Sequence, residues 1–116
     1  MAQFKVKIYD STYTVDEANS ESRIRAKCPK FFNFPGRNKR YSFYRGCVIA
    51  SSIVQYTGTK PQRKYVAYIY DDAQADTFCV SADCEPKNLR AAKRLIDRVL
   101  MAGRYEYGDN KPVSVV

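Results

Sequence analysis

The sequence predicts an α+β domain in which an antiparallel sheet packs against one long amphipathic helix. Apolar residues alternate with lysines over residues 3–9, which is typical of a half-buried strand. Aromatic and β-branched residues, interrupted by turn residues, fill 41–81, and apolar residues recur at helical spacing over 86–102. The 116 residues, 45% of them hydrophobic, fit a single compact domain over 1–116 with its own core.

The first strand is predicted over residues 3–9 and is expected to join the main sheet. Phe4, Val6 and Ile8 would face the core, while Lys5 and Lys7 would face solvent. Successive side chains of a strand point to opposite faces, so this alternation indicates one buried and one solvated face.

The segment after this strand supports two interpretations. Thr14 followed by Glu17 matches a capping box, and Pro29 would end a helix, which together predict a short helix over 15–28. The alternative is a strand at 12–15 that forms a hairpin with the first strand.

A three-stranded meander is predicted over 41–81. Residues 30–40 look irregular, with a turn at Pro35-Gly36. Strand-forming residues run from Tyr41 to Tyr56 and end at the turn sequence TGTKPQ. The second strand is KYVAYIY (64–70), and the third is TFCVS (77–81), after the acidic turn DDAQAD.

The clearest helix is predicted over 86–102. Pro86 fits a first helical turn and Gly103 a C-terminal stop. The residues that share the predicted apolar face are Leu89, Ala92, Ile96, Val99 and Leu100. The opposite face carries a basic stripe of Lys87, Arg90, Arg94 and Arg98.

The predicted order β-β-β-α over 41–102, with the helix starting PKNLRAAKR, resembles two nucleic-acid-binding architectures in topology. These are the double-stranded-RNA-binding domain and the arm-binding domain of phage-type integrases. The resemblance concerns the order of elements and identifies no family, so it is a weak guide to function.

Charge is distributed unevenly along the chain. The net charge is +8, with 20 Lys and Arg against 12 Asp and Glu. Residues 22–70 contain no acid, yet they hold eleven of the basic residues and ten of the sixteen aromatics. This pattern favours an anionic partner.

The sequence therefore predicts a small basic, non-enzymatic nucleic-acid-binding protein that contacts the phosphates of DNA or RNA. The candidate interface residues are Arg37, Lys39, Arg40, Tyr41, Tyr44, Arg45, Lys60, Arg63 and Lys64. The helical stripe of Lys87, Arg90, Arg94 and Arg98 is a second candidate face. Exposed aromatics would stack on unpaired bases, whereas buried ones would fill the core.

The alternative hypothesis is a protein-interaction module or inhibitor that docks onto an acidic partner protein. Small accessory proteins of viruses and mobile elements that block a host machine have this character: short, single-domain and without catalytic residues.

Catalytic and metal sites find little support in the sequence. The chain has no His, which excludes Ser-His and Cys-His nucleophile pairs. A zinc site would need all four cysteines, of which only Cys79 and Cys84 are close in sequence, so buried free thiols are expected and neither a metal nor a cofactor is predicted. Glu85-Pro86-Lys87 with Asp72 has the form of a metal-dependent nuclease motif, but that motif belongs on a strand, which leaves a nuclease as a remote alternative.

The expected location is cytoplasmic, with reduced thiols. The N-terminus has no signal-peptide pattern, and no apolar run approaches the length of a membrane span.

Overall fold

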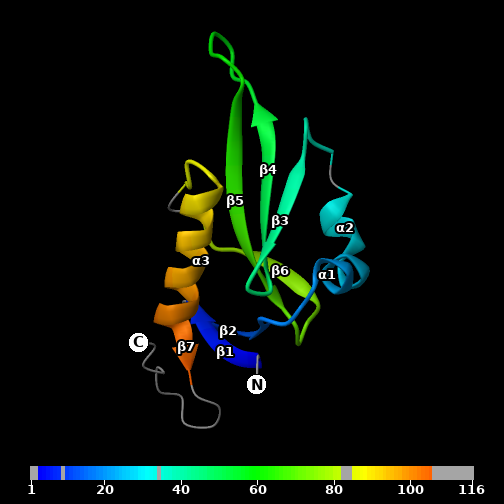
Figure 1. Ribbon diagram of the computed structural model, residues 1–116, viewed down its shortest axis with the longest axis vertical. Helices are drawn as coiled ribbons and strands as arrows, with labels where there is room; N and C mark the ends of the chain where they lie inside the picture. Colours follow the sequence, from blue (N-terminus) through cyan, green and yellow to red (C-terminus); the bar gives the residue numbers. More distant parts are fainter. Residues whose placement is uncertain (1–2, 9, 34, 82–84, 106–116) are drawn as a thin grey trace.

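The computed structural model describes residues 3–8, 10–33, 35–81 and 85–105. They form two antiparallel sheets and three helices, which confirms the α+β class (Figure 1). The elements, in chain order, are β1 (Gln3–Ile8), β2 (Ser11–Asp16), α1 (Glu21–Lys27), α2 (Pro29–Phe32), β3 (Arg40–Tyr44), β4 (Cys47–Val54), β5 (Gln62–Asp71), β6 (Asp76–Cys79), α3 (Leu89–Gly103) and β7 (Arg104–Tyr105).

The N-terminal strand is confirmed, but its predicted place in the main sheet is wrong. β1 pairs with β2 and β7 in a separate three-stranded sheet of order β2-β1-β7. Only two residues separate Ile8 from its partner Ser11, so the chain turns back at once and β2 takes one edge of β1. The other edge is taken by the short strand that follows α3.

The short helix predicted over 15–28 begins too early, and the hairpin alternative at 12–15 is confirmed. β2 covers Ser11–Asp16, where Thr, Tyr and Val favour a strand, so Thr14 cannot cap a helix. Ser20 is the N-cap of α1 instead, and its Oγ accepts a hydrogen bond from the Arg23 backbone N–H at 3.2 Å. The predicted stop at Pro29 separates α1 from the short helix α2.

The meander is confirmed with one strand more than predicted. Residues 41–56 were expected to be one strand, but they form β3 and β4, and the four-stranded sheet has the order β3-β4-β5-β6. The two strands are joined at Arg45-Gly46, where φ is +51° and +74°. Two successive positive φ values are those of a tight hairpin turn, and Arg-Gly lacks the usual Asn-Gly signature.

The long helix is confirmed, although its predicted start is three residues early. α3 begins at Leu89, and the Asn88 Oδ1 atom accepts a hydrogen bond from the Ala91 backbone N–H at 2.8 Å. Because α3 begins at Leu89, Lys87 lies in the segment before the helix and is not part of the helical stripe. Pro86, in the same segment, is buried.

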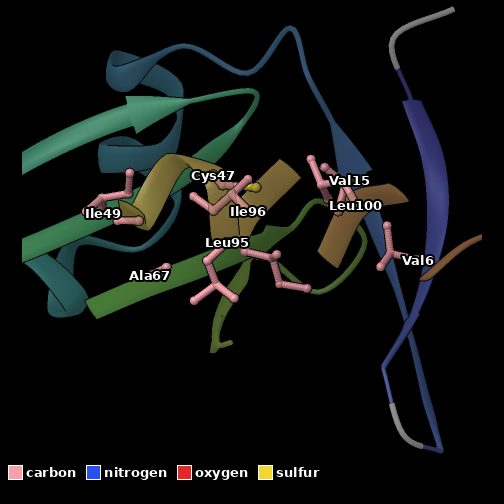
Figure 2. Packing of buried hydrophobic residues seen from close by; sticks show 10 residues of the cluster. Val6, Val15, Cys47, Ile49, Ala67, Leu95, Ile96 and Leu100 are labelled. Atoms are coloured by element: carbon pink, nitrogen blue, oxygen red, sulfur yellow. The ribbon is translucent and has the colours of Figure 1, made fainter. Parts of the chain in front are cut away.

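Helices cover both faces of the four-stranded sheet, each with its own core (Figure 1). α3 packs on one face, where Leu95, Ile96 and Leu100 meet Cys47 and other sheet residues (Figure 2). This core also includes Val6 and Val15, so the three-stranded sheet shares it. On the other face, Ile24 of α1 packs against Val48 and Tyr70, with the α2 phenylalanines beside them.

No helix in the described ranges is both long and apolar enough to cross a membrane.

Candidate nucleic-acid interface

The predicted interface residues divide between the two ends of the four-stranded sheet. The near end contains the β3–β4 turn at Arg45 and lies beside the three-stranded sheet (Figure 1). The distal end comprises residues 37–40 and 52–64, including the loop between β4 and β5 at the top of Figure 1.

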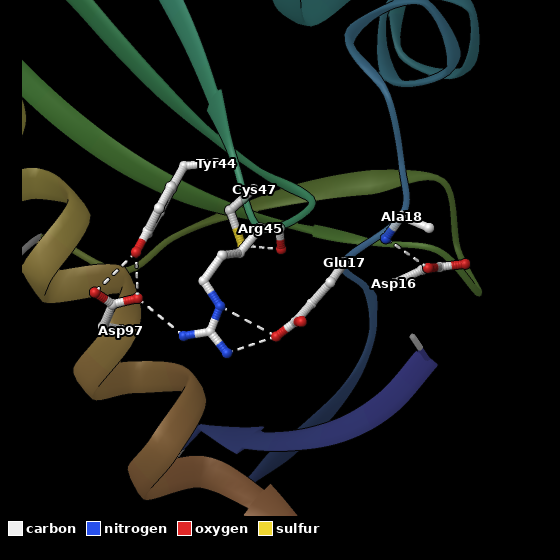
Figure 3. Close-up of polar contacts among 7 residues, drawn as sticks. All are labelled: Asp16, Glu17, Ala18, Tyr44, Arg45, Cys47 and Asp97. Atoms are coloured by element: carbon white, nitrogen blue, oxygen red, sulfur yellow. Dashed lines mark hydrogen bonds and ion pairs between the residues drawn. The ribbon is translucent and has the colours of Figure 1, made fainter. Parts of the chain in front are cut away.

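At the near end, Arg45 is held by two carboxylates from distant parts of the chain (Figure 3). Its Nη2 atom lies 2.6 Å from Glu17 Oε1, and its Nη1 atom lies 2.9 Å from Asp97 Oδ1. Tyr44 donates its hydroxyl to the same Asp97 carboxylate at 2.8 Å, and this hydrogen bond raises the pKa of Tyr44. The charge of Arg45 and the hydroxyl of Tyr44 are therefore already satisfied within the chain.

At the distal end, two basic segments that are distant in sequence lie side by side. The Ile53 backbone N–H donates to the Arg37 carbonyl at 2.8 Å. The Arg63 Nη1 atom donates to the Asn38 carbonyl at 3.0 Å and to Ser51 Oγ at 2.9 Å. These bonds fasten the loop before β3 to β4 and β5. The cations at this end are Arg37, Lys39, Arg40, Lys60, Arg63 and Lys64. Lys39 and Lys64 lie on the α2 face, whereas Arg40 and Arg63 alternate with Tyr41 and Lys64 along their strands and face the opposite side.

Few carboxylates oppose these distal cations. Arg37, Arg40 and Lys60 are exposed, and none of them forms an ion pair with a carboxylate in the described part of the chain. Lys64 does so, because its Nζ lies 3.0 Å from Glu85 Oε1. Lys87 adds a further cation, since it lines one shallow depression together with residues 62–64.

An open groove of about 410 Å³ lies on the distal half of the α2 face. α1 and α2 cover the near half of this face and end at Phe32, so the distal half of the sheet stays open on that side. The aromatic and basic residues that line the groove include Phe31, Lys39, Tyr41, Tyr56, Lys64 and Tyr68. Tyr41 of the predicted set therefore belongs to the groove rather than to the exposed surface alone.

The outer face of α3 is a second basic surface. Arg90, Arg94 and Arg98 are exposed, and none of them pairs with a carboxylate among the residues described. Asp97 lies between them in a shallow depression, but it is the carboxylate that binds Arg45.

The acidic residues behind the nuclease alternative make contacts that join the two sheets. Asp71 Oδ1 accepts from the Thr14 backbone N–H of β2 at 3.0 Å, and Asp72 Oδ2 accepts from Gln3 Nε2 of β1 at 3.1 Å. Within the described ranges, no three His, Cys, Asp or Glu side chains gather as a metal site would require. Cys84, part of the zinc hypothesis, lies outside the described residues.

Sequence reasoning missed the roles of Glu17, Asp97 and Glu85. Each of these acids lies outside the acid-free window 22–70 and pairs with a cation inside it. It also missed Arg25, whose guanidinium lies 4.6 Å from the centre of the Phe32 ring. No local pattern marks these long-range pairs.

No protein-family model matches the chain, and neither a curated protein nor a solved structure shows significant similarity to it.

Proposed function

We propose that this protein binds nucleic acid through the distal end of the four-stranded sheet. One observation carries the proposal: the basic loop at 37–40 and the basic turn at 60–64 are adjacent at this end of the sheet, joined by the hydrogen bond from Arg63 to Asn38. Its exposed cations Arg37, Arg40 and Lys60 have no carboxylate partner among the described residues.

Cations without internal partners favour a polyanion for a simple electrostatic reason. A Lys or Arg that is already paired must lose its carboxylate before it can bind a phosphate. An unpaired, exposed cation only displaces water, and the nucleic acid releases its condensed counterions, which makes binding steeply salt-dependent. The net charge of +8 adds long-range attraction during approach.

The rigid setting of the cations supports the proposal further. The Ile53 backbone N–H and the Arg63 side chain donate to the carbonyls of Arg37 and Asn38 and hold their loop on the sheet, so less order has to be gained on binding. Lys87 and the α3 arginines extend the basic surface beyond the sheet, and they would serve as secondary phosphate contacts.

The test is a binding titration with two matched charge variants. Fluorescence anisotropy would follow a labelled oligonucleotide in about 50 mM salt, where ordinary non-specific binding gives a Kd of about 10⁻⁴ M or tighter. The distal triple variant is Arg37→Gln, Arg40→Gln, Lys60→Gln. The helix triple variant is Arg90→Gln, Arg94→Gln, Arg98→Gln.

Both variants lose three positive charges, so a general effect of net charge would weaken them equally. We expect the distal variant to bind roughly tenfold or more weakly, because three phosphate contacts are lost, and the helix variant to lose less. No binding to any nucleic acid, or an equal loss in both variants, would overturn the proposal. In the first case, an acidic partner protein captured from nuclease-treated extract would be the function to pursue.

We propose a cytoplasmic location with reduced thiols. Cys28, Cys47 and Cys79, the cysteines in the described part of the chain, are all free, which supports a reducing compartment.

A further inference from the structure

We infer that the groove on the α2 face holds unpaired bases, so that the protein prefers single-stranded nucleic acid to a duplex. This inference rests on the proposed function, because it assigns the partner's class at the same end of the sheet. Phosphates would lie on the distal cations, and bases would enter the groove.

The floor of the groove is hollow because β4 presents small side chains there. Ala50 pairs with Tyr41 on β3 and with Val66 on β5, and Ser52 pairs with Lys64. β3 and β5 are two strand spacings apart, about 10 Å. Small residues on the middle strand between larger ones on its neighbours leave room for a flat ring.

The walls of the groove are aromatic and fixed in place. The Phe31 ring meets the Tyr68 ring edge-on at 4.8 Å between centroids, and it lies 6.1 Å from the Tyr41 ring. Tyr56 lies at the rim of the groove, and 66% of its surface is exposed, which is a large fraction for an aromatic residue. Aromatic rings that are rigid or exposed in this way are surfaces on which bases stack without regard to sequence.

The charge around the groove selects a polyanion over an apolar peptide. Lys39 lines it beside β3, and Lys64 lines it from β5 in an ion pair with Glu85. The exposed cation Lys60 lies in the loop between β4 and β5. Glu85 is the acidic residue among the described lining residues, and Lys64 neutralises it at 3.0 Å. A groove with aromatic walls and nearby cations complements a strand that exposes both its bases and its phosphates.

A duplex satisfies only half of this arrangement. Its bases are paired and stacked inside the helix, so they cannot enter a groove on a sheet, and only its phosphates would bind. The groove should therefore add affinity for a single strand alone.

The test compares three labelled probes: an oligothymidylate of about 12 nucleotides, the matching oligouridylate, and a duplex of equal length. We expect at least one single strand to bind more tightly than the duplex, and the ratio of the two single strands tells DNA from RNA. Equal or tighter binding of the duplex would overturn the inference.

Three variants test the groove itself. Tyr56→Ala should weaken single-strand binding by about 5- to 150-fold, the range for one lost stacking contact, while duplex binding stays unchanged. Ala50→Leu fills the floor without changing charge and should have the same selective effect. Met101→Ala is the control, because it trims an apolar side chain that is 51% exposed on α3.

The two proposals fail in different ways. If single strand and duplex bind equally and neither groove variant changes this, the groove inference is wrong while the distal phosphate surface stands. If no probe binds, both proposals are wrong.

Discussion

The two ends of the four-stranded sheet carry the same kind of cation but surround it differently. At the near end, Arg45 lies between Glu17 and Asp97, at 2.6 Å and 2.9 Å. At the distal end, Arg37 and Arg40 are exposed, and no carboxylate of the described residues pairs with them. Arg40 and Arg45 are only five positions apart in the chain: Arg40 is the first residue of β3, and Arg45 directly follows its last residue.

This difference shows that the fold, and not the local sequence, decides which cations are available to a partner. β3 runs along β4 from the distal end of the sheet to the near end, so its first and last residues lie at opposite ends of the sheet. The near end meets β2 and α3, which bring the acids. The distal end extends past both elements, so its cations face solvent. We interpret the near end as a structural joint and the distal end as the binding surface.

The largest effect should come from disrupting the joint at Gly46. A Cβ at this position would collide with the backbone oxygen of Asp16, and φ of +74° already disfavours other residues. Gly46→Ala should therefore destabilise the protein by about 3 kcal/mol or more, measured by urea unfolding. Gly58→Ala is the matched control at the distal end, where φ is +80° but nothing lies within 4 Å. A cost of only about 1 kcal/mol is expected there, and equal losses at both sites would contradict the structure.

A smaller effect should follow from removing the joint's cation. Arg45→Met leaves Glu17 without its cation and Asp97 with only the hydrogen bond from Tyr44, but the site is half exposed, so water compensates in part. We expect a loss of about 2 kcal/mol in the free energy of unfolding. Arg40→Met, five residues away, should change it by less than about 0.5 kcal/mol. A larger loss of stability in Arg40→Met than in Arg45→Met would contradict this and would make the distal cations the structural ones.

Cys47, whose side chain lies in the core beside Arg45, can test whether water is excluded from the core at the near end. Burial raises the pKa of Cys47 to about 12 from an ordinary value of 9.0. A folded pKa above the unfolded one means that stability is full below pH 9 and falls as the pH rises towards 12. At pH 10 the titration of Cys47 should lower the free energy of unfolding by about 1 kcal/mol relative to pH 8, and Cys47→Ala should not show this loss. Unfolding curves of both proteins at pH 8 and pH 10 measure the difference, and parallel behaviour would place Cys47 in contact with water.

Much of the fold follows from local sequence patterns. Strict alternation over 3–9 and helical spacing over 86–102 each predict an element that exists, because burial of one face imposes the period. The Arg45-Gly46 turn was missed because Arg-Gly is not one of the common hairpin pairs such as Asn-Gly or Asp-Gly. The second sheet was missed because β1 pairs with Tyr105, one hundred residues away, and no local pattern encodes such a partner.

The candidate site was predictable only in part, because local patterns identify cations but not the distant residues that pair with them. The acid-free window led to the distal cations, since nearby acids are the usual neutralising partners. It also included Arg45, and it could not reveal that Glu17 and Asp97, which lie outside the window, pair with this cation. The groove depends on Phe31, Ala50 and Tyr68 meeting across three elements, which only the folded chain reveals.

The most direct test of the account is the salt dependence of nucleic-acid binding in three proteins: wild type, the distal triple variant and Arg45→Gln. The slope of log K against log salt counts the phosphates neutralised, at about 0.9 per contact with a duplex and about 0.7 with a single strand. We expect the distal triple variant to lower the magnitude of the slope by about 2 to 3, and Arg45→Gln to leave it unchanged. An unchanged slope in the distal variant, or an equal reduction in Arg45→Gln, would contradict the division of the molecule into a binding end and a structural end.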